Sequence, residues 1–244
     1  LASRPMVYLR RLHSGLGLVA IGGVFLLSHW LFFELFIKWP SPSINPTLWF
    51  AYFTIRTPLS MIGAGVMILG LYMFASPDRP IEEGARPTRS RKVLRLSLIA
   101  TVATGALWWG VWLTPAPGFQ TPAFFYYVGP PAAFVLTAAT AIMASMLRMR
   151  YVAERLGSKK LTRLANVLRW AIPIVSILGF ALVAWAYLYL FNSSLLGNPG
   201  LMLRLEDLPF VPAFLCAVMY LGLTLRIRHR LGVQIRAGRE RIYR

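Results

Sequence analysis

Cysteine, histidine and acidic residues are scarce in this chain of 244 residues. The single cysteine, Cys216, excludes a disulfide framework and excludes zinc or iron–sulfur sites built from several thiolates of this chain. Only 8 Asp and Glu are present, and none of them clusters in the middle of an apolar run, as carboxylates do in cation-driven transporters and pumps. The sequence also lacks a Gly-rich phosphate loop, an HExxH zinc motif and a nucleophile elbow. We therefore predict no metal site and no catalytic residue of the chain's own.

Apolar residues, in contrast, are abundant. Hydrophobic side chains make up 57% of the chain and charged side chains 14%, a composition typical of integral membrane proteins. Six apolar runs have the roughly 20 residues that a helix needs to cross a bilayer. They lie at about 14–37, 48–75, 96–114, 122–147, 170–191 and 208–225. The sequence thus predicts an all-α fold, a polytopic integral membrane helical bundle that forms a single transmembrane domain over 1–244.

The Lys and Arg residues are distributed asymmetrically among the segments that flank these runs. All of the 26 except Lys38, Arg56 and Arg204 precede the first run, follow the sixth, or lie between runs two and three or runs four and five. By the positive-inside rule these segments are cytoplasmic, so both termini are cytoplasmic and residues 226–244 form a basic cytoplasmic tail. This pattern predicts a multi-pass protein of a bacterial-type inner membrane.

The basic cytoplasmic surface has two candidate partners. Anionic headgroups of membrane lipids attract Lys and Arg beside a membrane span, and an acidic partner subunit would be attracted in the same way. Nucleic acid is disfavoured, because the aromatic residues lie in the apolar runs rather than among the basic residues. Within the tail, Leu231, Ile235 and Ile242 fall on one side, as in an amphipathic helix at the membrane interface.

Two of the three histidines, His13 and His29, lie at the two ends of the first run. At a rise of about 1.5 Å per residue they are roughly 24 Å apart along one helix, so they cannot ligate the same iron. His13 lies at the cytoplasmic mouth with Arg10, Arg11 and Ser14, where an interfacial role and a partner-facing or cofactor-edge role are both open. His29 has apolar neighbours, and its candidate roles are quinone hydrogen-bond donor, haem ligand, or a histidine satisfied by a Ser or Thr of another helix.

Two further ionisable residues lie near the predicted outer end of this run. Glu34 follows His29 by five residues, and Arg56 enters the second run from the same side. Glu34 and Arg56 either pair at similar depth or stay apart, with Arg56 extending to the interface. If they pair, the three side chains would form a polar pocket suited to binding and deprotonating a quinol.

Glycine and proline mark several of the predicted spans. Gly15, Gly17, Gly22 and Gly23 lie on the first run, and Gly63, Gly65 and Gly70 lie on the second. Small residues at such positions predict close packing of helices or room for a flat cofactor. Pro130 and Pro131 predict a bend in the fourth run, and Pro173 predicts a perturbed start of the fifth.

The start of the chain carries a resemblance to a known family. The motif Arg-Arg-Leu-His-Ser at residues 10–14, followed by a Gly-containing apolar helix and then His29, resembles the start of the single-chain cytochrome b subunit of succinate dehydrogenases and fumarate reductases. The specific match covers about 25 residues. For this chain the resemblance implies a haem ligand at His29 and a bound quinone (menaquinone or ubiquinone). It also implies flavoprotein and iron–sulfur subunits docked on the cytoplasmic side.

The chain also departs from that family. No run after the first contains a histidine, and His229 lies in the tail, so a complete bis-His set for haem b is absent from this sequence. The resemblance therefore implies a membrane-anchor subunit of a respiratory oxidoreductase of the succinate:quinone oxidoreductase type, which contributes to quinone binding and docks soluble redox subunits. Two alternatives stay open: a non-catalytic structural subunit of a respiratory or photosynthetic membrane complex, and a small-molecule permease.

Overall fold

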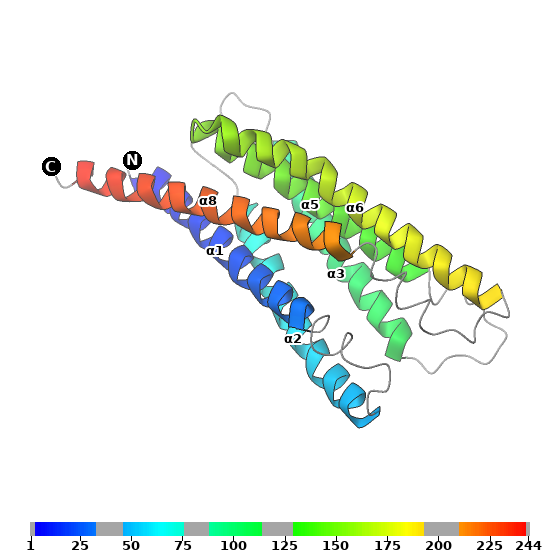
Figure 1. Cartoon of the computed structure of the whole chain (residues 1–244). Coiled ribbons are helices and arrows are strands. Elements are labelled where there is room, and N and C mark those ends of the chain that lie inside the picture. The colour runs from blue at the N-terminus through cyan, green and yellow to red at the C-terminus, as the bar shows by residue number, and fades with distance from the viewer. Residues whose placement is uncertain (1–2, 33–45, 76–87, 114–128, 193–209, 243–244) are drawn as a thin grey trace. The chain divides into compact units, whose positions relative to one another are not determined.

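Helices form all the regular structure in the part of the chain that the computed structural model describes, which is residues 3–32, 46–75, 88–113, 129–192 and 210–242. They are α1 (Ser3–Phe32), α2 (Pro46–Phe74), α3 (Thr88–Leu113), α5 (Gly129–Arg155), α6 (Lys159–Asn192) and α8 (Phe210–Ile242), labelled as in Figure 1. The predicted all-α class is therefore confirmed for these residues.

Four of the described segments are long and apolar enough to cross a membrane: Val7–Ser28, Gly129–Arg155, Lys159–Leu182 and Val211–Ala237. The apolar part of α2, Pro58–Phe74, is shorter. Large apolar side chains are exposed on these helices, including Ile21 at 62% and Leu178 at 64%, which is unfavourable in water and favourable in lipid. The protein is thus a helical membrane protein, while the count of six spans stays a prediction.

The chain divides into two compact units. The first contains Leu1–Arg86, Tyr151–Thr162 and Ala217–Arg244, and the second contains Pro87–Arg150 and Arg163–Cys216. Helices α5, α6 and α8 each contribute to both units, so the elements of each unit come from distant parts of the sequence.

Helices α1 and α2 of the first unit pack closely against each other at glycine positions. A Cβ atom at position 15 would lie 2.9 Å from the carbonyl oxygen of Gly70, and one at position 22 would lie 2.6 Å from that of Gly63. Both distances are shorter than real Cβ contacts, so the two backbones approach closely because these residues are glycine. The pairing is antiparallel, since the higher number on α1 faces the lower number on α2.

A second side of α1 packs against α8, also in antiparallel register. A Cβ at position 23 would lie 2.6 Å from Leu221, and one at position 232 would lie 3.4 Å from the Nε2 atom of His13. The beginning of α1 and the end of α8 therefore lie at the same end of the first unit, as the N and C marks in Figure 1 show.

The turn between α5 and α6 is set by backbone geometry. Gly157 has a φ of 67°, a conformation that other residues adopt only with strain. The Gly157 N–H donates to the carbonyl of Glu154 and the Ser158 N–H donates to that of Ala153, which is the Schellman arrangement that ends a helix. The Ser158 carbonyl then accepts the N–H of Thr162, so α6 begins one residue later.

Helices α3 and α5 of the second unit meet through side chains. The hydroxyl oxygens of Thr104 and Thr137 lie 2.9 Å apart, within hydrogen-bonding distance. The rings of Trp108 and Phe134 are tilted at 41° with their centroids 5.4 Å apart. The edge of the Phe134 ring also covers Gly105, where a Cβ would lie 3.3 Å away.

One expectation about local structure was wrong. Pro130 and Pro131 do not bend a helix, because α5 begins at Gly129 and both prolines lie in its first turn, where the missing N–H needs no partner. The predicted tail is helical in its described part, because α8 continues to Ile242, and two residues of its apolar side, Leu231 and Ile235, are buried in the protein at 2% and 8% exposure.

Candidate functional site

The predicted site residues fall partly within the described structure. His13 is half-buried on α1, and Arg10, Arg11 and Ser14 are exposed on the same helix. His29 and Arg56 are residues of α1 and α2, but their side chains lie outside the described part of the chain. Glu34 also lies outside the described residues. The roles assigned to His29, Glu34 and Arg56 therefore stay predictions.

The register of the α1–α2 pair nevertheless relates two of these positions. Gly15 faces Gly70 and Gly22 faces Gly63, so a step of seven residues along α1 corresponds to a step of seven in the opposite direction along α2. One further step leads to position 29 on α1 and position 56 on α2, and both positions are helical. The register thus relates position 29 to position 56 if it continues unchanged past the last printed contact, a relation that the sequence alone does not reveal.

His13 is packed against α8 rather than isolated on α1. Its Nε2 atom borders Gly232, and its surroundings include the charge of Arg228. The Arg228 guanidinium lies over the backbone of Gly17, where a Cβ would be 3.3 Å from Nε and 3.4 Å from Cζ. Among the residues that the structure describes, none is a hydrogen-bond partner for the buried Nε atom of Arg228. A histidine and an arginine thus share the α1–α8 interface of the first unit.

Within the described residues, no three His, Cys, Asp or Glu side chains come together as they would around a metal ion. A bis-His haem site needs two histidines that face one iron. His13 is engaged at the α1–α8 interface and His229 is exposed on α8. The two histidines whose side chains are described therefore do not fit a haem b site. The side chain of His29 lies outside the described part of the chain, so its assignment as a haem ligand stays a prediction.

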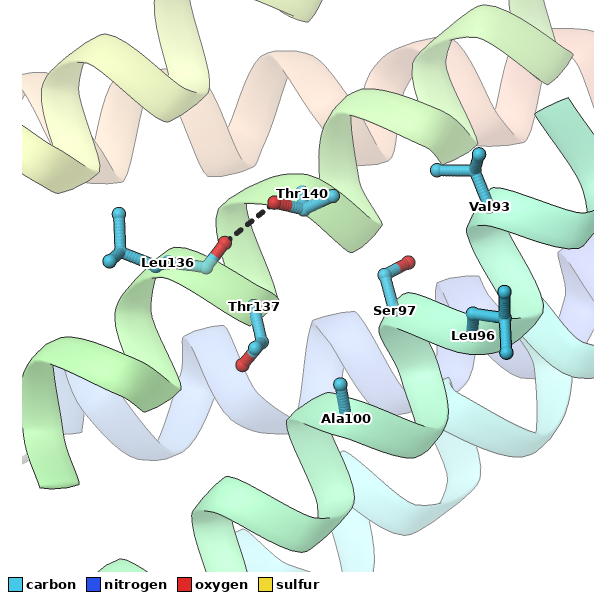
Figure 2. Close-up of a pocket in the computed structure, with 7 residues that line it drawn as sticks. All are labelled: Val93, Leu96, Ser97, Ala100, Leu136, Thr137 and Thr140. Carbon is cyan, nitrogen blue, oxygen red and sulfur yellow. Dashed lines mark hydrogen bonds between the residues drawn. The ribbon is translucent and has the colours of Figure 1, made fainter.

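The second unit holds a groove between α3 and α5 with a volume of about 380 Å³. Figure 2 shows the side chains that line it: Val93, Leu96, Ser97, Ala100, Leu136, Thr137 and Thr140. Its walls are aliphatic apart from three hydroxyl groups, and it contains no titratable residue.

The three hydroxyls of this groove are already hydrogen-bonded to helix carbonyls. Ser97 donates to Leu94 at 3.0 Å, and Thr140 donates to Leu136 at 2.8 Å, as the dashed line in Figure 2 shows. Thr137 lies 2.9 Å from the carbonyl of Ala133. Hydroxyls satisfied in this way cost little in lipid and give a ligand headgroup little to bind. The groove suits a lipid acyl or isoprenoid chain better than the polar ring of a quinone.

One class of residue was placed wrongly by the sequence reasoning. Arg148, expected in a cytoplasmic loop, lies inside α5 and is 1% exposed, and Arg91 on α3 is 6% exposed. A signal was present in the sequence, since Ala141, Ser145 and Arg148 follow the three-to-four-residue spacing of one buried helix face. The periodicity of α5 thus predicts that Arg148 is buried, whereas the positive-inside rule counts it only as a charge near the membrane surface.

Comparison of the chain with family models, with curated proteins and with solved structures finds no match.

Proposed function

We propose that this protein is a membrane-anchor subunit of a respiratory oxidoreductase of the succinate:quinone oxidoreductase type, which contributes to quinone binding and docks soluble redox subunits. The observation that supports the proposal is the register of α1 and α2, which, continued by seven residues beyond the Gly22–Gly63 contact, relates position 29 near the end of α1 to position 56 within α2. A histidine and an arginine at one depth in lipid are costly, which favours a functional role for both.

The proposed topology has six spans with both termini in the cytoplasm. It is supported by the antiparallel packing of α8 on α1, because His13 near the start of α1 borders Gly232 near the end of α8. The strong excess of Lys and Arg in the segments assigned to this side gives the orientation in a bacterial-type inner membrane.

The proposed docking surface is the end of the first unit at which α1 begins and α8 ends. Exposed cations there come from α1, from the start of α6 and from α8: Arg10, Arg11, Lys159, Lys160, Arg226, Arg230 and Arg236. Such a surface attracts an acidic protein face and raises its association rate. Flavoprotein and iron–sulfur subunits would bind here through acidic faces.

A bound quinone would supply two-electron, two-proton chemistry at the opposite end of α1. In the proposed site His29 would donate a hydrogen bond to a quinone oxygen, and Glu34 would accept one of the two protons that a quinol releases. The second proton would pass to water at the membrane surface, and the two electrons would pass to redox cofactors of the partner subunits. In this proposal Arg56 pairs with Glu34 as its counter-ion.

A non-catalytic structural subunit is the second candidate. It is favoured by the tight α1–α2 and α1–α8 packing and by the apolar groove between α3 and α5, since all three features serve packing against helices or lipid. Such a subunit would co-purify with large partners and would leave their quinone chemistry independent of His29.

The substitution His29→Ala separates these two candidates. In the anchor role it is expected to lower quinone turnover of the native complex by about 100-fold, the loss typical of a group that assists proton transfer. Turnover of succinate or fumarate with a water-soluble electron partner should not change. The matched control is Ser28→Ala, at an exposed neighbouring residue of α1, which should leave both activities intact. Unchanged quinone turnover in His29→Ala would favour the structural role.

A further inference from the structure

A second cavity, in the first unit, has a chemistry opposite to that of the groove between α3 and α5. It has a volume of about 410 Å³ and lies between the turn that joins α5 to α6 and the second half of α8. The residues that line it are Ser158, Lys160, Leu161, Leu225, Arg226, His229 and Arg230. Three of these side chains are permanent cations, one is a histidine, and none is acidic.

The positions of these groups are fixed by local structure. The Schellman turn at Gly157 and the start of α6 at Lys159 place Ser158 and Lys160 on one wall. Arg226 and Arg230 are four residues apart on α8, so they lie on the same face of that helix and form the opposite wall. The buried side chains of Leu161 and Leu231 anchor the two walls in the core of the first unit.

The concentration of positive charge in this pocket favours the binding of an anion. Lys160, Arg226 and Arg230 repel one another, and the repulsion is stronger beside a membrane than in bulk water because the effective dielectric constant is lower. Basic pockets between the cytoplasmic ends of membrane helices bind phosphate-bearing headgroups for this reason. Arg presents a planar set of N–H donors that matches phosphate oxygens.

The apolar part of the pocket points to a lipid rather than to a free ion. Leu225 lines the pocket and is 45% exposed. Along α8 from Leu225, the next positions on that face are Gly222, where a Cβ would meet nothing within 4 Å, and Val218, which is also 45% exposed. An exposed apolar track therefore leads away from the basic pocket, as the acyl chain of a phospholipid requires.

We propose that this pocket binds an anionic phospholipid, with its phosphate held by Lys160, Arg226 and Arg230 and its acyl chain lying along the Leu225–Val218 face of α8. The site needs only that the protein is embedded in a membrane, and it does not depend on an anchor role or on quinone binding. The lipid would tie the α5–α6 turn to α8 and so stabilise the cytoplasmic end of the first unit.

The test measures thermal unfolding of the full-length chain in a mild detergent at increasing concentrations of phosphatidylglycerol. Phosphatidylcholine and inorganic phosphate serve as parallel additives. We expect phosphatidylglycerol alone to raise the Tm, because it combines a net negative headgroup with acyl chains. An equal rise with inorganic phosphate would show a site for a small ion and would overturn the assignment to a lipid.

The pocket variant is Lys160→Gln, Arg226→Gln and Arg230→Gln together. Each Lys or Arg beside an anionic headgroup strengthens binding by roughly fivefold, so the apparent affinity for phosphatidylglycerol should fall by about 100-fold. The matched control is Arg155→Gln, Lys159→Gln and Arg236→Gln, which removes three exposed cations of the same unit that do not line the pocket. An equal loss of affinity in both variants would show general attraction to the surface and would overturn the proposal.

A charge-conserving variant provides a second test in case the triple glutamine variant does not fold. Arg226→Lys with Arg230→Lys keeps the net charge of the pocket but removes the planar guanidinium donors, so it should keep part of the stabilisation by phosphatidylglycerol, and more of it than the triple glutamine variant. If the triple glutamine variant does not fold, the wild-type additive series together with this variant still decides the question. Absence of any rise in Tm with phosphatidylglycerol in the wild-type chain would contradict the proposal outright.

Discussion

The α1–α2 pair of the first unit and the α3–α5 pair of the second unit show two ways to join helices in lipid. In α1–α2 the contact is backbone against backbone, through Gly15 with Gly70 and Gly22 with Gly63. In α3–α5 the contact is made by a pair of threonine hydroxyls and a pair of aromatic rings, and a groove of about 380 Å³ remains beside them.

The difference follows from how membrane helices associate. Lipid removes most of the hydrophobic driving force between helices, so association depends on close packing and on hydrogen bonds. Glycine allows close packing but fixes the register, because any larger side chain meets a carbonyl or an amide of the other helix. Threonine and aromatic pairs tolerate adjustment, since a rotamer or a ring can move. The same register, continued by seven residues, relates position 29 of α1 to position 56 of α2.

The largest effect is expected from Gly22→Ala. The new Cβ would lie 2.6 Å from the Gly63 oxygen and 2.7 Å from the Met67 nitrogen, and neither backbone atom can move unless the helices separate. Overpacking of this kind costs about 1–3 kcal/mol. The free energy of unfolding, measured by denaturant titration in detergent, should fall by that amount.

The control for this substitution is Gly65→Ala on the same pair. A Cβ at position 65 would have nothing within 4 Å, so the free energy of unfolding should stay the same or rise slightly. Equal effects at Gly22 and Gly65 would mean that the two backbones do not approach closely at Gly22.

A smaller effect is expected from the threonine pair of α3 and α5. In a double-mutant cycle of Thr104→Val and Thr137→Val, the coupling energy should be about 0.6 kcal/mol, the average found for hydrogen bonds between membrane helices. Thr140→Val, whose hydroxyl donates within its own helix, combined with Thr104→Val should give no coupling. A coupling of zero for the first pair would remove the interhelical hydrogen bond from the description.

The smallest effect is expected from Gly105→Ala. Its Cβ would meet only the edge of the Phe134 ring, at 3.3 and 3.4 Å, and a small tilt of the ring would relieve the contact. The loss in free energy of unfolding should be below about 0.5 kcal/mol, because the higher helix propensity of alanine offsets most of the strain. A loss as large as that of Gly22→Ala would show that α3–α5 is as rigid as α1–α2.

The sequence predicted a helical membrane protein, because hydropathy depends on composition. It did not predict where the helices begin and end. Helices α1, α6 and α8 extend beyond the apolar runs into segments rich in Arg and Lys, which hydropathy treats as loops although both residues favour helix. The bend predicted at Pro130 and Pro131 was wrong because the sequence did not show that α5 begins at Gly129.

The candidate site was predictable only in its residue types. Scarce ionisable residues in apolar runs identified His13, His29, Glu34 and Arg56. That His13 borders Gly232 required the tertiary register of α1 and α8, since the two residues are distant in sequence. The basic pocket could not be predicted from the sequence either, because the α5–α6 turn and α8 come together only in the fold.

The most direct test of the anchor role is purification of the native complex in a mild detergent, with identification of the co-purifying subunits and a reduced-minus-oxidised spectrum of the same sample. The account predicts flavoprotein and iron–sulfur subunits in stoichiometric amounts and no b-type haem signal from this chain. Pigment-binding or unrelated partners, without a flavoprotein, would contradict the anchor role and favour the structural one.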